Sequence, residues 1–322
     1  MKQDSCLVSV VIPTHKRPQA VARAVESALA QSYSRLEVIV VIDGPEPETM
    51  RILRCFDDDR LRPIMLDEDV GGAEARNIGV RAAYGEWIAF LDDDDEWLPG
   101  KLKRQMEKAA NIRVESPVLS SRLVERSDRT ERVLPRRLYK TGENVAEYLF
   151  CRTGFAYGEG MLQTSTLLTK RKLLLNEPFQ KGLQRHQDWD WLLKISERTD
   201  VQITMVPDVL TVMHVAKGVD SVSRTGDWKF SLEWVKASRR RMSARAYSFF
   251  IATECVSRAR RCGAGVGAML RLFWECVGRG EPGLRQMVLF AGFCLVQNEV
   301  RRKFRRRCAR DSAMTIGSYK QT

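Results

Sequence analysis

The sequence has 322 residues, of which 44% are apolar and 29% are charged, so it has room for two domains and is too apolar for a disordered chain. Its formal net charge of +12 is concentrated at one end. Residues 1–223 carry 32 basic and 34 acidic side chains, whereas residues 224–322 carry 21 basic and 7 acidic ones, a net charge of +14. This distribution excludes a nucleic-acid-binding protein that is basic throughout. It predicts a polyanionic surface as the partner of the C-terminal part.

The eight cysteines are scattered along the chain, with no CxxC pair and no histidine at zinc-ligand spacing. No signal-peptide pattern precedes the first apolar run, and scattered thiols without an export signal are typical of the reducing cytoplasm. The longest uncharged apolar-rich run near the C-terminus, Gln286–Asn298, is shorter than the roughly 20 residues that span a bilayer. We therefore expect a cytoplasmic protein without a transmembrane segment.

The N-terminal third alternates apolar strand-like runs with amphipathic helical ones. The expected strands are Cys6–Ile12, Leu36–Ile42, Leu61–Leu66 and Trp87–Leu91, and the expected helices begin at Pro18, Glu46 and Ala73. Strands that alternate with helices at this spacing predict an α/β fold with a mostly parallel sheet and flanking helices.

Farther along the chain the pattern is less regular. Pro117–Val124 and Met161–Thr169 are predicted to be strands and Gln187–Thr199 a helix, and a strand-like segment precedes His214. After Asp227 the pattern is helical, with arginine-rich faces. We therefore predict an α/β domain in residues 1–225 and a helical, basic extension in residues 226–322.

Polar side chains follow the first four predicted strands, at the edge where ligands of parallel sheets bind. The four loops at this edge are Pro13–Arg17, Asp43–Gly44, Asp67–Gly72 and Asp92–Asp95. The first loop carries cations and the other three carry carboxylates, which predicts a binding site there. The first loop has no glycine, and this argues against a dinucleotide-binding dehydrogenase, whose GxGxxG turn directly follows the first strand.

The acidic run Asp92–Glu96 lies between two core-like segments, WIAFL and WLP. Carboxylates crowded at the end of a buried strand repel one another, so a bound cation would relieve the repulsion. Mg²⁺ and Mn²⁺ prefer oxygen ligands and often combine one or two carboxylates with substrate phosphate oxygens. The run therefore predicts a divalent metal site, although most acidic runs are simply solvated surface.

Four motifs in this order, VSVVIPTHKRP, VIDG, GGAEARNIGV and WIAFLDDDDEWLP, resemble those of the inverting family 2 glycosyltransferases of bacterial type, over about residues 5–225. The resemblance implies a Rossmann-like GT-A fold, a nucleotide-sugar donor and Mg²⁺ or Mn²⁺ as cofactor. It also implies a set of donor-binding residues, namely Pro13, Thr14, His15, Arg17, Asp43, Arg76, Asn77, Asp92 and Asp93. Among these, Asp43 is expected to bind the base, which is uracil or an equivalent, with Pro13, His15 and Arg17 around it. Arg76 and Asn77 are expected to face the nucleotide and its diphosphate.

The same resemblance assigns the metal ligands. Asp92 and Asp94 match the DxD pair of the family, with Asp94 the more direct ligand, and His214 occupies the place of a third ligand in several such enzymes. Structural interpretations remain open for some positions. Asp43 could simply belong to a turn, Arg76 could form an ion pair with the strand-end acids, and His214 could be a buried histidine with a hydrogen-bond partner.

A second cluster, His186–Trp191, contains the candidate catalytic base. The resemblance places the base at Asp188, preceded by Gln187 where family members usually carry an acid. Asp190 remains an alternative base, and Asp188 could instead cap a helix. The implied reaction is an inverting sugar transfer from a nucleotide-sugar, UDP-linked by expectation, in which Asp188 takes the proton of an acceptor hydroxyl. A GT-A-like nucleotidyltransferase and a non-catalytic polyanion-binding protein are the alternatives.

In the C-terminal region, the arginine-rich segments Val256–Arg261 and Glu299–Arg310 flank the apolar segments Ala268–Val277 and Met287–Val296. Apolar helices flanked by cations are typical of interfacial helices on anionic lipid. We therefore expect a protein peripheral to the inner face of the cell membrane. Its acceptor would be a glycan or a lipid-linked glycan, as in bacterial envelope polysaccharide or lipopolysaccharide assembly. A helical subdomain packed on the catalytic domain is the alternative, and nucleic acid is not expected as a partner because no RNA-binding motif is present.

Overall fold

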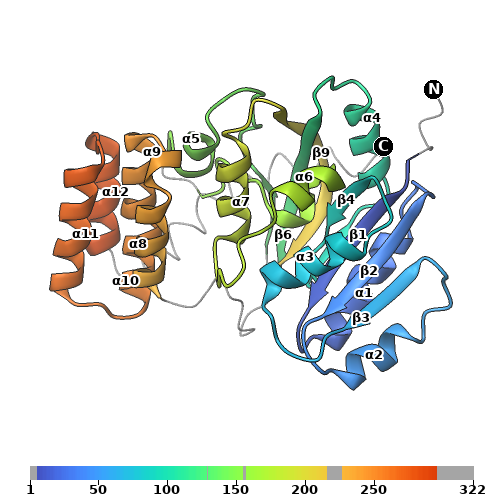
Figure 1. Cartoon of the computed structure of the whole chain (residues 1–322). Helices are drawn as coiled ribbons and strands as arrows, with labels where there is room; N and C mark the ends of the chain where they lie inside the picture. Colours follow the sequence, from blue (N-terminus) through green and yellow to red (C-terminus); the bar gives the residue numbers. More distant parts are fainter. Residues whose placement is uncertain (1–5, 129, 155–156, 216–226, 296–322) are drawn as a thin grey trace. The chain divides into compact units, whose positions relative to one another are not determined.

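The computed structural model describes residues 6–128, 130–154, 157–215 and 227–295 (Figure 1). These residues fall into two compact units. The sheet unit comprises the described residues of Met1–Arg126, Leu138–Gly142 and Leu162–Val215, and the helical unit comprises those of Ser127–Arg137, Glu143–Met161 and Ala216–Thr322. The helical unit thus combines the C-terminal region with two segments that come earlier in the chain.

The sheet unit is built on one mixed sheet. Its strands are β1 (Val8–Thr14), β2 (Leu36–Ile42), β3 (Leu61–Met65), β4 (Trp87–Phe90), β5 (Asp95–Trp97), β6 (Ser116–Ser127), β8 (Leu168–Lys170) and β9 (Val201–His214). Their order in space is β3-β2-β1-β4-β8-β6-β9-β5. β1 is parallel to β2 and β4, and β2 is parallel to β3, whereas β8 is antiparallel to β4 and β6. The carboxyl ends of β2, β1 and β4 therefore meet at one edge of the sheet.

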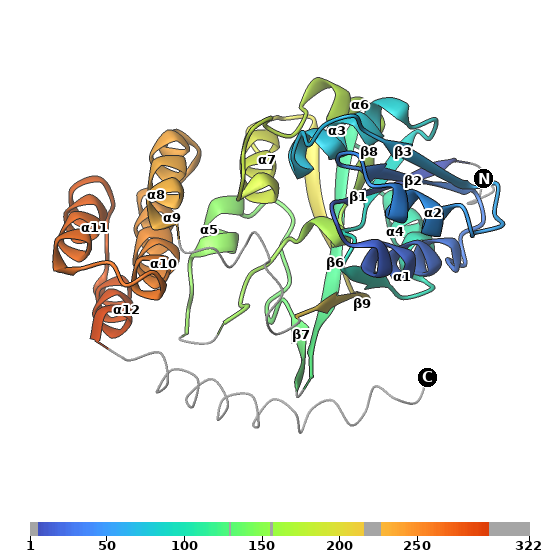
Figure 2. The same cartoon turned by 90° about the horizontal axis from the view of Figure 1, so that it is seen from below.

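Helices cover both faces of this sheet, which is why β1 and β2 are apolar without alternation. The helices of the sheet unit are α1 (Pro18–Leu29), α2 (Pro47–Leu53), α3 (Gly72–Ala82), α4 (Lys101–Ala109), α6 (Arg171–Asn176) and α7 (Gln187–Ile195). Figure 2 shows α3 and α6 on one face and α1 and α4 on the other. α3 lies so close to β1 that a Cβ atom on Gly79 would be 2.4 Å from Cγ1 of Val11.

Most of the predicted elements are confirmed. The strands expected near β1 to β4 are present, and α1 begins at Pro18 and buries Val21, Ala24, Val25 and Ala28 as its apolar stripe. The prediction of a strand over Met161–Thr169 is wrong for most of its length, because the short 3₁₀ helix Thr164–Thr166 precedes the three-residue β8. Here the Gln163 side chain accepts the N–H of Ser165 at 2.8 Å, a local bond that competes with strand pairing.

The helical unit has its own apolar core. Its elements are β7 (Thr130–Leu134), α5 (Val145–Phe150), α8 (Trp228–Ala237), a 3₁₀ turn (Arg239–Arg241), α9 (Ala244–Phe250), a π-helical turn (Ile251–Cys255), α10 (Val256–Arg261), α11 (Val266–Arg279) and α12 (Leu284–Leu295). Phe150, Trp234 and Phe250 form an aromatic cluster with ring centroids 5.1 to 6.4 Å apart. No helix within the described residues is long and apolar enough to cross a membrane.

Candidate active site

The ends of β1, β2 and β4 are tied together through Thr14. The Thr14 carbonyl oxygen accepts the N–H of Asp43, which follows β2, at 2.9 Å. The Thr14 hydroxyl donates to Asp93 Oδ2, which follows β4, at 2.8 Å. Pro13 precedes Thr14 in β1 and lies opposite Val41 of β2. Residues that lie far apart in the sequence thus line one edge of the sheet, as the alternating pattern predicts.

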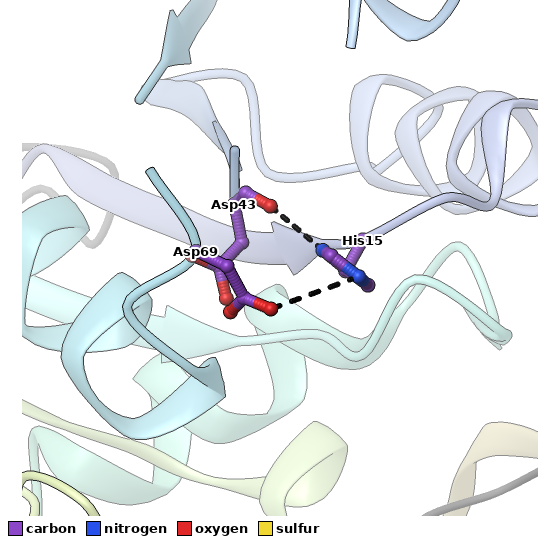
Figure 3. A group of neighbouring side chains, drawn as sticks. All are labelled: His15, Asp43 and Asp69. Atoms are coloured by element: carbon purple, nitrogen blue, oxygen red, sulfur yellow. Dashed lines mark hydrogen bonds and ion pairs between the residues drawn. The ribbon is translucent and has the colours of Figure 1, made fainter. Parts of the chain in front are cut away.

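His15, Asp43 and Asp69 form a compact group beside this edge (Figure 3), with one ligand atom from each within 4.8 Å of the others. His15 Nδ1 lies 2.7 Å from the backbone oxygen of Asp43, and His15 Nε2 lies 3.9 Å from Asp69 Oδ2. Burial raises the pKa of Asp43 and the charge of Asp69 raises it further, while the N–H of Val70, 2.7 Å from Asp43 Oδ1, opposes the increase. The group can accept hydrogen bonds from the N–H groups of a base, or it can ligate a cation.

Three acids and one arginine occupy the end of β4. Arg17 Nη1 donates to Asp93 Oδ1 at 3.1 Å and to Asp94 Oδ2 at 2.8 Å. Burial raises the pKa of Asp93 to about 6, and the charges of Asp94 and Asp92 add to an increase that Arg17 opposes. The pKa of Asp94 is also raised, by burial and by Asp92. The Asp94 side chain is 39% exposed, against 26% for Asp92 and 8% for Asp93, so Asp94 is the acid most open to a ligand.

The acids fit a divalent metal by the chemistry of their oxygens. Carboxylate oxygens are the ligands that Mg²⁺ and Mn²⁺ prefer, and a cation would relieve the repulsion that raises the pKa values of Asp93 and Asp94. His214, the predicted third ligand, ends β9, and its Nε2 lies 2.6 Å from Glu96 Oε1. Glu96 Oε1 also accepts from Arg23 Nε at 2.8 Å. His214 is thus held by Glu96 rather than by Asp92 or Asp94.

Arg76, on α3, connects the acids to α7. Its Nη2 donates to Asp92 Oδ1 at 2.5 Å and its Nη1 donates to Gln187 Oε1 at 2.7 Å. Gln187 also donates from Nε2 to the backbone oxygen of Leu183 at 2.7 Å. Gln187, which stands where family members usually have an acid, therefore accepts a hydrogen bond from Arg76 as a neutral group. Arg76 remains ion-paired with Asp92.

Asp188 is the second residue of α7, and the N-cap is His186, whose φ of 65° is left-handed. Oδ1 of Asp188 accepts a hydrogen bond from the N–H of Trp189 at 2.9 Å. Burial raises the pKa of Asp188 to about 6, and the charge of Asp92 adds to the effect, while the Trp189 N–H and Arg76 oppose it. A carboxylate with this pKa is ionised at neutral pH and is more basic than an ordinary aspartate, which suits a general base.

A buried hydrogen-bond network beneath Asp92 escaped the sequence reasoning. Asp95 is only 2% exposed, and its Oδ2 accepts from the Ser165 hydroxyl at 2.6 Å and from Gln163 Nε2 at 2.8 Å. Gln163 Nε2 also lies 3.2 Å from Asp92 Oδ2, and Ser165 Oγ accepts the N–H of Asp92 at 3.0 Å. Asp95 therefore helps to hold Asp92 in place through Gln163 and Ser165 and is not itself exposed at the edge of the sheet. Only the three-dimensional contact between β4 and residues 163–165 shows this.

Asn77 is buried and is held by the segment that leads into α7. Its amide exchanges two hydrogen bonds of 3.0 Å with the backbone of Phe179, and its Nδ2 donates to Glu74 Oε2 at 3.1 Å. Of the predicted donor-binding residues, the structure brings together Thr14, Arg17, Asp92, Asp93 and Arg76 by direct contacts, and His15 with Asp43 beside them. Asn77 contacts Phe179 and Glu74 instead.

The fold and this acidic edge define a glycosyltransferase of GT-A type. The family "Glycosyl transferase family 2" matches residues 9–170, which is half of the chain. The chain belongs to this family. Membership decides against the nucleotidyltransferase and the non-catalytic polyanion-binding protein, and it confirms the enzyme class and the GT-A fold that the motifs predicted.

Named relatives and solved structures agree with this assignment. The chain is 25% identical over 271 residues to the amylovoran biosynthesis glycosyltransferase AmsB of Erwinia amylovora, an alignment that covers 81% of this chain and 87% of AmsB. It is 36% identical over 100 residues to the UDP-Glc:alpha-D-GlcNAc-diphosphoundecaprenol beta-1,3-glucosyltransferase WfaP of Escherichia coli, covering 31% of this chain and 40% of WfaP. The mannosyltransferase PcManGT of Pyrobaculum calidifontis, solved with GDP-Man and Mn²⁺, has a TM-score of 0.57 and 17% identity, covering 98% of this chain and 88% of PcManGT, and shows the shared fold.

Proposed function

We propose that this glycosyltransferase transfers a sugar from a UDP-linked donor to a hydroxyl acceptor with inversion at the anomeric carbon. The observation that carries the proposal is the pair of bonds made by Arg76, which contacts Asp92 at the donor end and Gln187 beside Asp188. The candidate base is therefore next to the strand-end acids, as an in-line attack on a bound nucleotide-sugar requires.

The donor would bind along the edge formed by β2, β1 and β4. Asp43, with Pro13 and His15 around it, would bind the base. The pKa of Asp43 is raised by its burial and by the charge of Asp69. Arg76 would contact the diphosphate. Arg17, expected beside the base, bonds instead to Asp93 and Asp94 and would also contact the diphosphate. Thr14 would orient Asp93 toward the ribose, and Asn77 would act through the Phe179 segment. That segment leads into the helix that carries the base.

Asp94 and Asp92 would hold Mg²⁺ or Mn²⁺, with His214 as the third candidate ligand. When bound, the metal would neutralise the charge that develops on the leaving nucleoside diphosphate. The residues Gln163, Ser165 and Asp95 keep Asp92 in place through the bonds described above. Asp188 would accept the proton of the acceptor hydroxyl as that hydroxyl attacks, with no second acid needed for a diphosphate leaving group.

The acceptor is proposed from the names of the relatives. AmsB is named for amylovoran biosynthesis, and the name of WfaP gives a sugar diphosphoundecaprenol as its acceptor. We accordingly place this enzyme in bacterial envelope polysaccharide or lipopolysaccharide assembly. It would act on a glycan or lipid-linked glycan at the cytoplasmic face of the cell membrane, with the cationic C-terminal region on anionic lipid.

A donor screen tests the proposal. Purified protein is incubated with UDP-, GDP- and dTDP-linked sugars, with and without Mn²⁺, and release of the nucleoside diphosphate is measured. We expect metal-dependent release from a UDP-sugar and, once an acceptor is supplied, a product of inverted configuration by NMR. Preference for a GDP-sugar would overturn the assignment of uracil as the nucleobase of the donor. A retained configuration would overturn the single-displacement mechanism.

A further inference from the structure

Two helices of the helical unit expose large apolar side chains. Of the eleven large apolar side chains that are exposed in the described residues, six lie between positions 266 and 288. Four are on α11 and two are on α12, namely Val266 (75% exposed), Leu270 (53%), Trp274 (67%), Val277 (39%), Leu284 (82%) and Val288 (46%). An apolar group of this size on a monomer usually marks an interaction surface.

The four residues of α11 follow one another at intervals of four, four and three residues, which places them on a single face of the helix. We call Val266, Leu270, Trp274 and Val277 the α11 face. The opposite side of α11 is already packed, because Leu272 and Cys276 are fully buried and Cys276 Sγ lies 3.6 Å from the backbone oxygen of Ser248 on α9. The α11 face is thus additional to the core contact. Figures 1 and 2 both show α11 at the margin of the group formed by α8 to α12.

The exposed charged side chains of α11 and α12 themselves are all arginines. The single acid of α11, Glu275, turns inward and accepts the hydroxyl of Tyr247 at 2.5 Å. The exposed charges on the two helices are Arg271, Arg279 and Arg285, and α12 contains no acid. Arg271 lies 3.2 Å from the exposed Glu233 of α8, and Arg279 lies 3.6 Å from Glu275 on the side of α11 away from the α11 face. Over residues 227–295 there are 12 basic and 5 acidic side chains, and residues 296–322 add 8 basic and 2 acidic ones.

This charge distribution selects the occupant. A second copy of the chain would bring two cationic surfaces together, and the chain's own residues 296–322 carry the same sign of charge as the helices they would cover. An anionic bilayer offers both an apolar interior for the valines, leucine and tryptophan and phosphate groups for the arginines.

We propose that the α11 face lies in the interface of an anionic bilayer, with Trp274 at its centre and Arg271 and Arg285 at the level of the lipid phosphates. This deepens the proposed function and rests on it for the purpose of the contact, which is to keep the enzyme beside a lipid-linked acceptor. Of the two apolar segments expected on lipid, Ala268–Val277 and Met287–Val296, it assigns the contact mainly to the first, which lies in α11.

The test uses the full chain and vesicles of phosphatidylglycerol and phosphatidylcholine, with pure phosphatidylcholine as the uncharged comparison. The wild type should sediment with the anionic vesicles, less so as salt rises, and brominated acyl chains should quench its tryptophan fluorescence. The double variant Leu270→Ser, Trp274→Ser should lower the partition constant at least about tenfold, because two large apolar groups no longer enter the lipid. Arg271→Glu with Arg285→Glu should weaken binding to the anionic vesicles and reduce its dependence on salt.

The matched control is Leu175→Ser, which removes a 44% exposed leucine from α6 in the sheet unit and should leave vesicle binding unchanged. Circular dichroism checks that each variant is folded. Equal binding by the double variant and the wild type would overturn the proposal. So would binding that disappears only when residues 296–322 are deleted, or a wild type that ignores vesicles and forms a dimer that the double variant loses. Donor hydrolysis without lipid should be the same in all variants, so its absence from the wild type would count against the proposed function and not against the α11 face.

Discussion

Two carboxyl groups of the candidate site have pKa values raised mainly by burial. Asp93 and Asp188 both have a pKa raised to about 6, and in each case burial is the largest cause, with neighbouring acids adding to it. Their side chains are chemically alike, but their neighbours differ, because Asp93 contacts Thr14 and Arg17 whereas Asp188 begins a helix. In the proposed mechanism, this difference would give Asp93 a donor-side role and Asp188 the role of proton acceptor.

The pH dependence of turnover should report on Asp188. The pKa of Asp188 is raised to about 6. Below about pH 6 the carboxyl group is therefore mostly protonated and cannot act as a base. We expect kcat to fall on the acid side of that value. Asp188→Asn should reduce kcat by roughly 10²–10⁴ with nearly unchanged donor affinity and should remove the acid limb of the profile. Steady-state kinetics from pH 5 to 8 measure this.

Asp190→Asn is the control for that experiment. Asp190 is two residues farther along α7, a spacing at which helical side chains do not face each other. Its variant should retain most of the activity and the same acid limb. The reverse ranking of the two variants would move the base to Asp190.

Asp94 should control the metal dependence of donor binding. It is the most exposed of the strand-end acids, and Arg17 is its partner in the structure. Asp94→Asn should abolish the gain in UDP affinity that Mn²⁺ provides, as measured by titration calorimetry with and without the ion. Glu86→Gln changes an acid at the opposite end of β4, which pairs with Lys170, and should keep the gain. A metal effect of wild-type size in Asp94→Asn would remove Asp94 from the ligand set, and the same measurement on His214→Gln tests the third candidate ligand.

Among the elements, α3 is placed by a glycine. A Cβ atom at Gly79 would lie 2.4 Å from Val11 Cγ1 and 3.3 Å from Val41 Cγ2, so α3 would have to move away from β1 and β2. Gly79→Ala should lower the free energy of unfolding by about 1–3 kcal/mol, as overpacking of a core does. Gly267→Ala is the matched change on α11, where nothing lies within 4 Å, and it should raise stability by up to about 1 kcal/mol. Urea unfolding compares them, and equal effects would contradict this account of the packing.

The first turn of α7 should respond to a charge at Gln187. Its Oε1 now accepts from Arg76, which also contacts Asp92. Gln187→Glu would attract Arg76 away from Asp92 and place a negative charge beside Asp188, so the acid limb of the kcat profile should move to higher pH. Gln187→Met removes the hydrogen bond without adding charge and should leave the limb in place. An unchanged limb in Gln187→Glu would show that the two side chains are not electrostatically coupled.

At the scale of the whole molecule, the helical unit depends on α12. α12 contributes Gln286, Leu289 and Phe290, all buried, and Phe290 contacts Phe273. A chain ending at Arg279 loses these contacts, and the loss of one large buried side chain alone costs roughly 3–5 kcal/mol. We expect a lower melting temperature, by circular dichroism, for that truncation than for a chain that ends at Leu295 and keeps α12. Similar melting of both truncations would show that α12 is dispensable for the unit.

The sequence by itself determined the strands β1 to β4, the acidic edge and the family. These features follow from local patterns, since continuous apolar runs predict buried strands and a parallel sheet brings the ends of successive strands to one edge. The positions of Thr14, Arg17, Asp43 and Asp92 could therefore be anticipated from their place after a strand.

Only the tertiary structure decided which of these side chains contact one another and which faces remain uncovered. The bond between Arg76 and Gln187 joins residues 111 positions apart, and the burial of Asp95 depends on Ser165, 70 positions away. No periodicity encodes such pairs, because they arise from how α3, α7 and the 163–165 segment pack on the sheet. In the same way, α11 is apolar on two sides, and its sequence does not say which side the other helices cover. Packing against α9 and the π-helical turn buried the side of Leu272 and Cys276 and left the α11 face exposed.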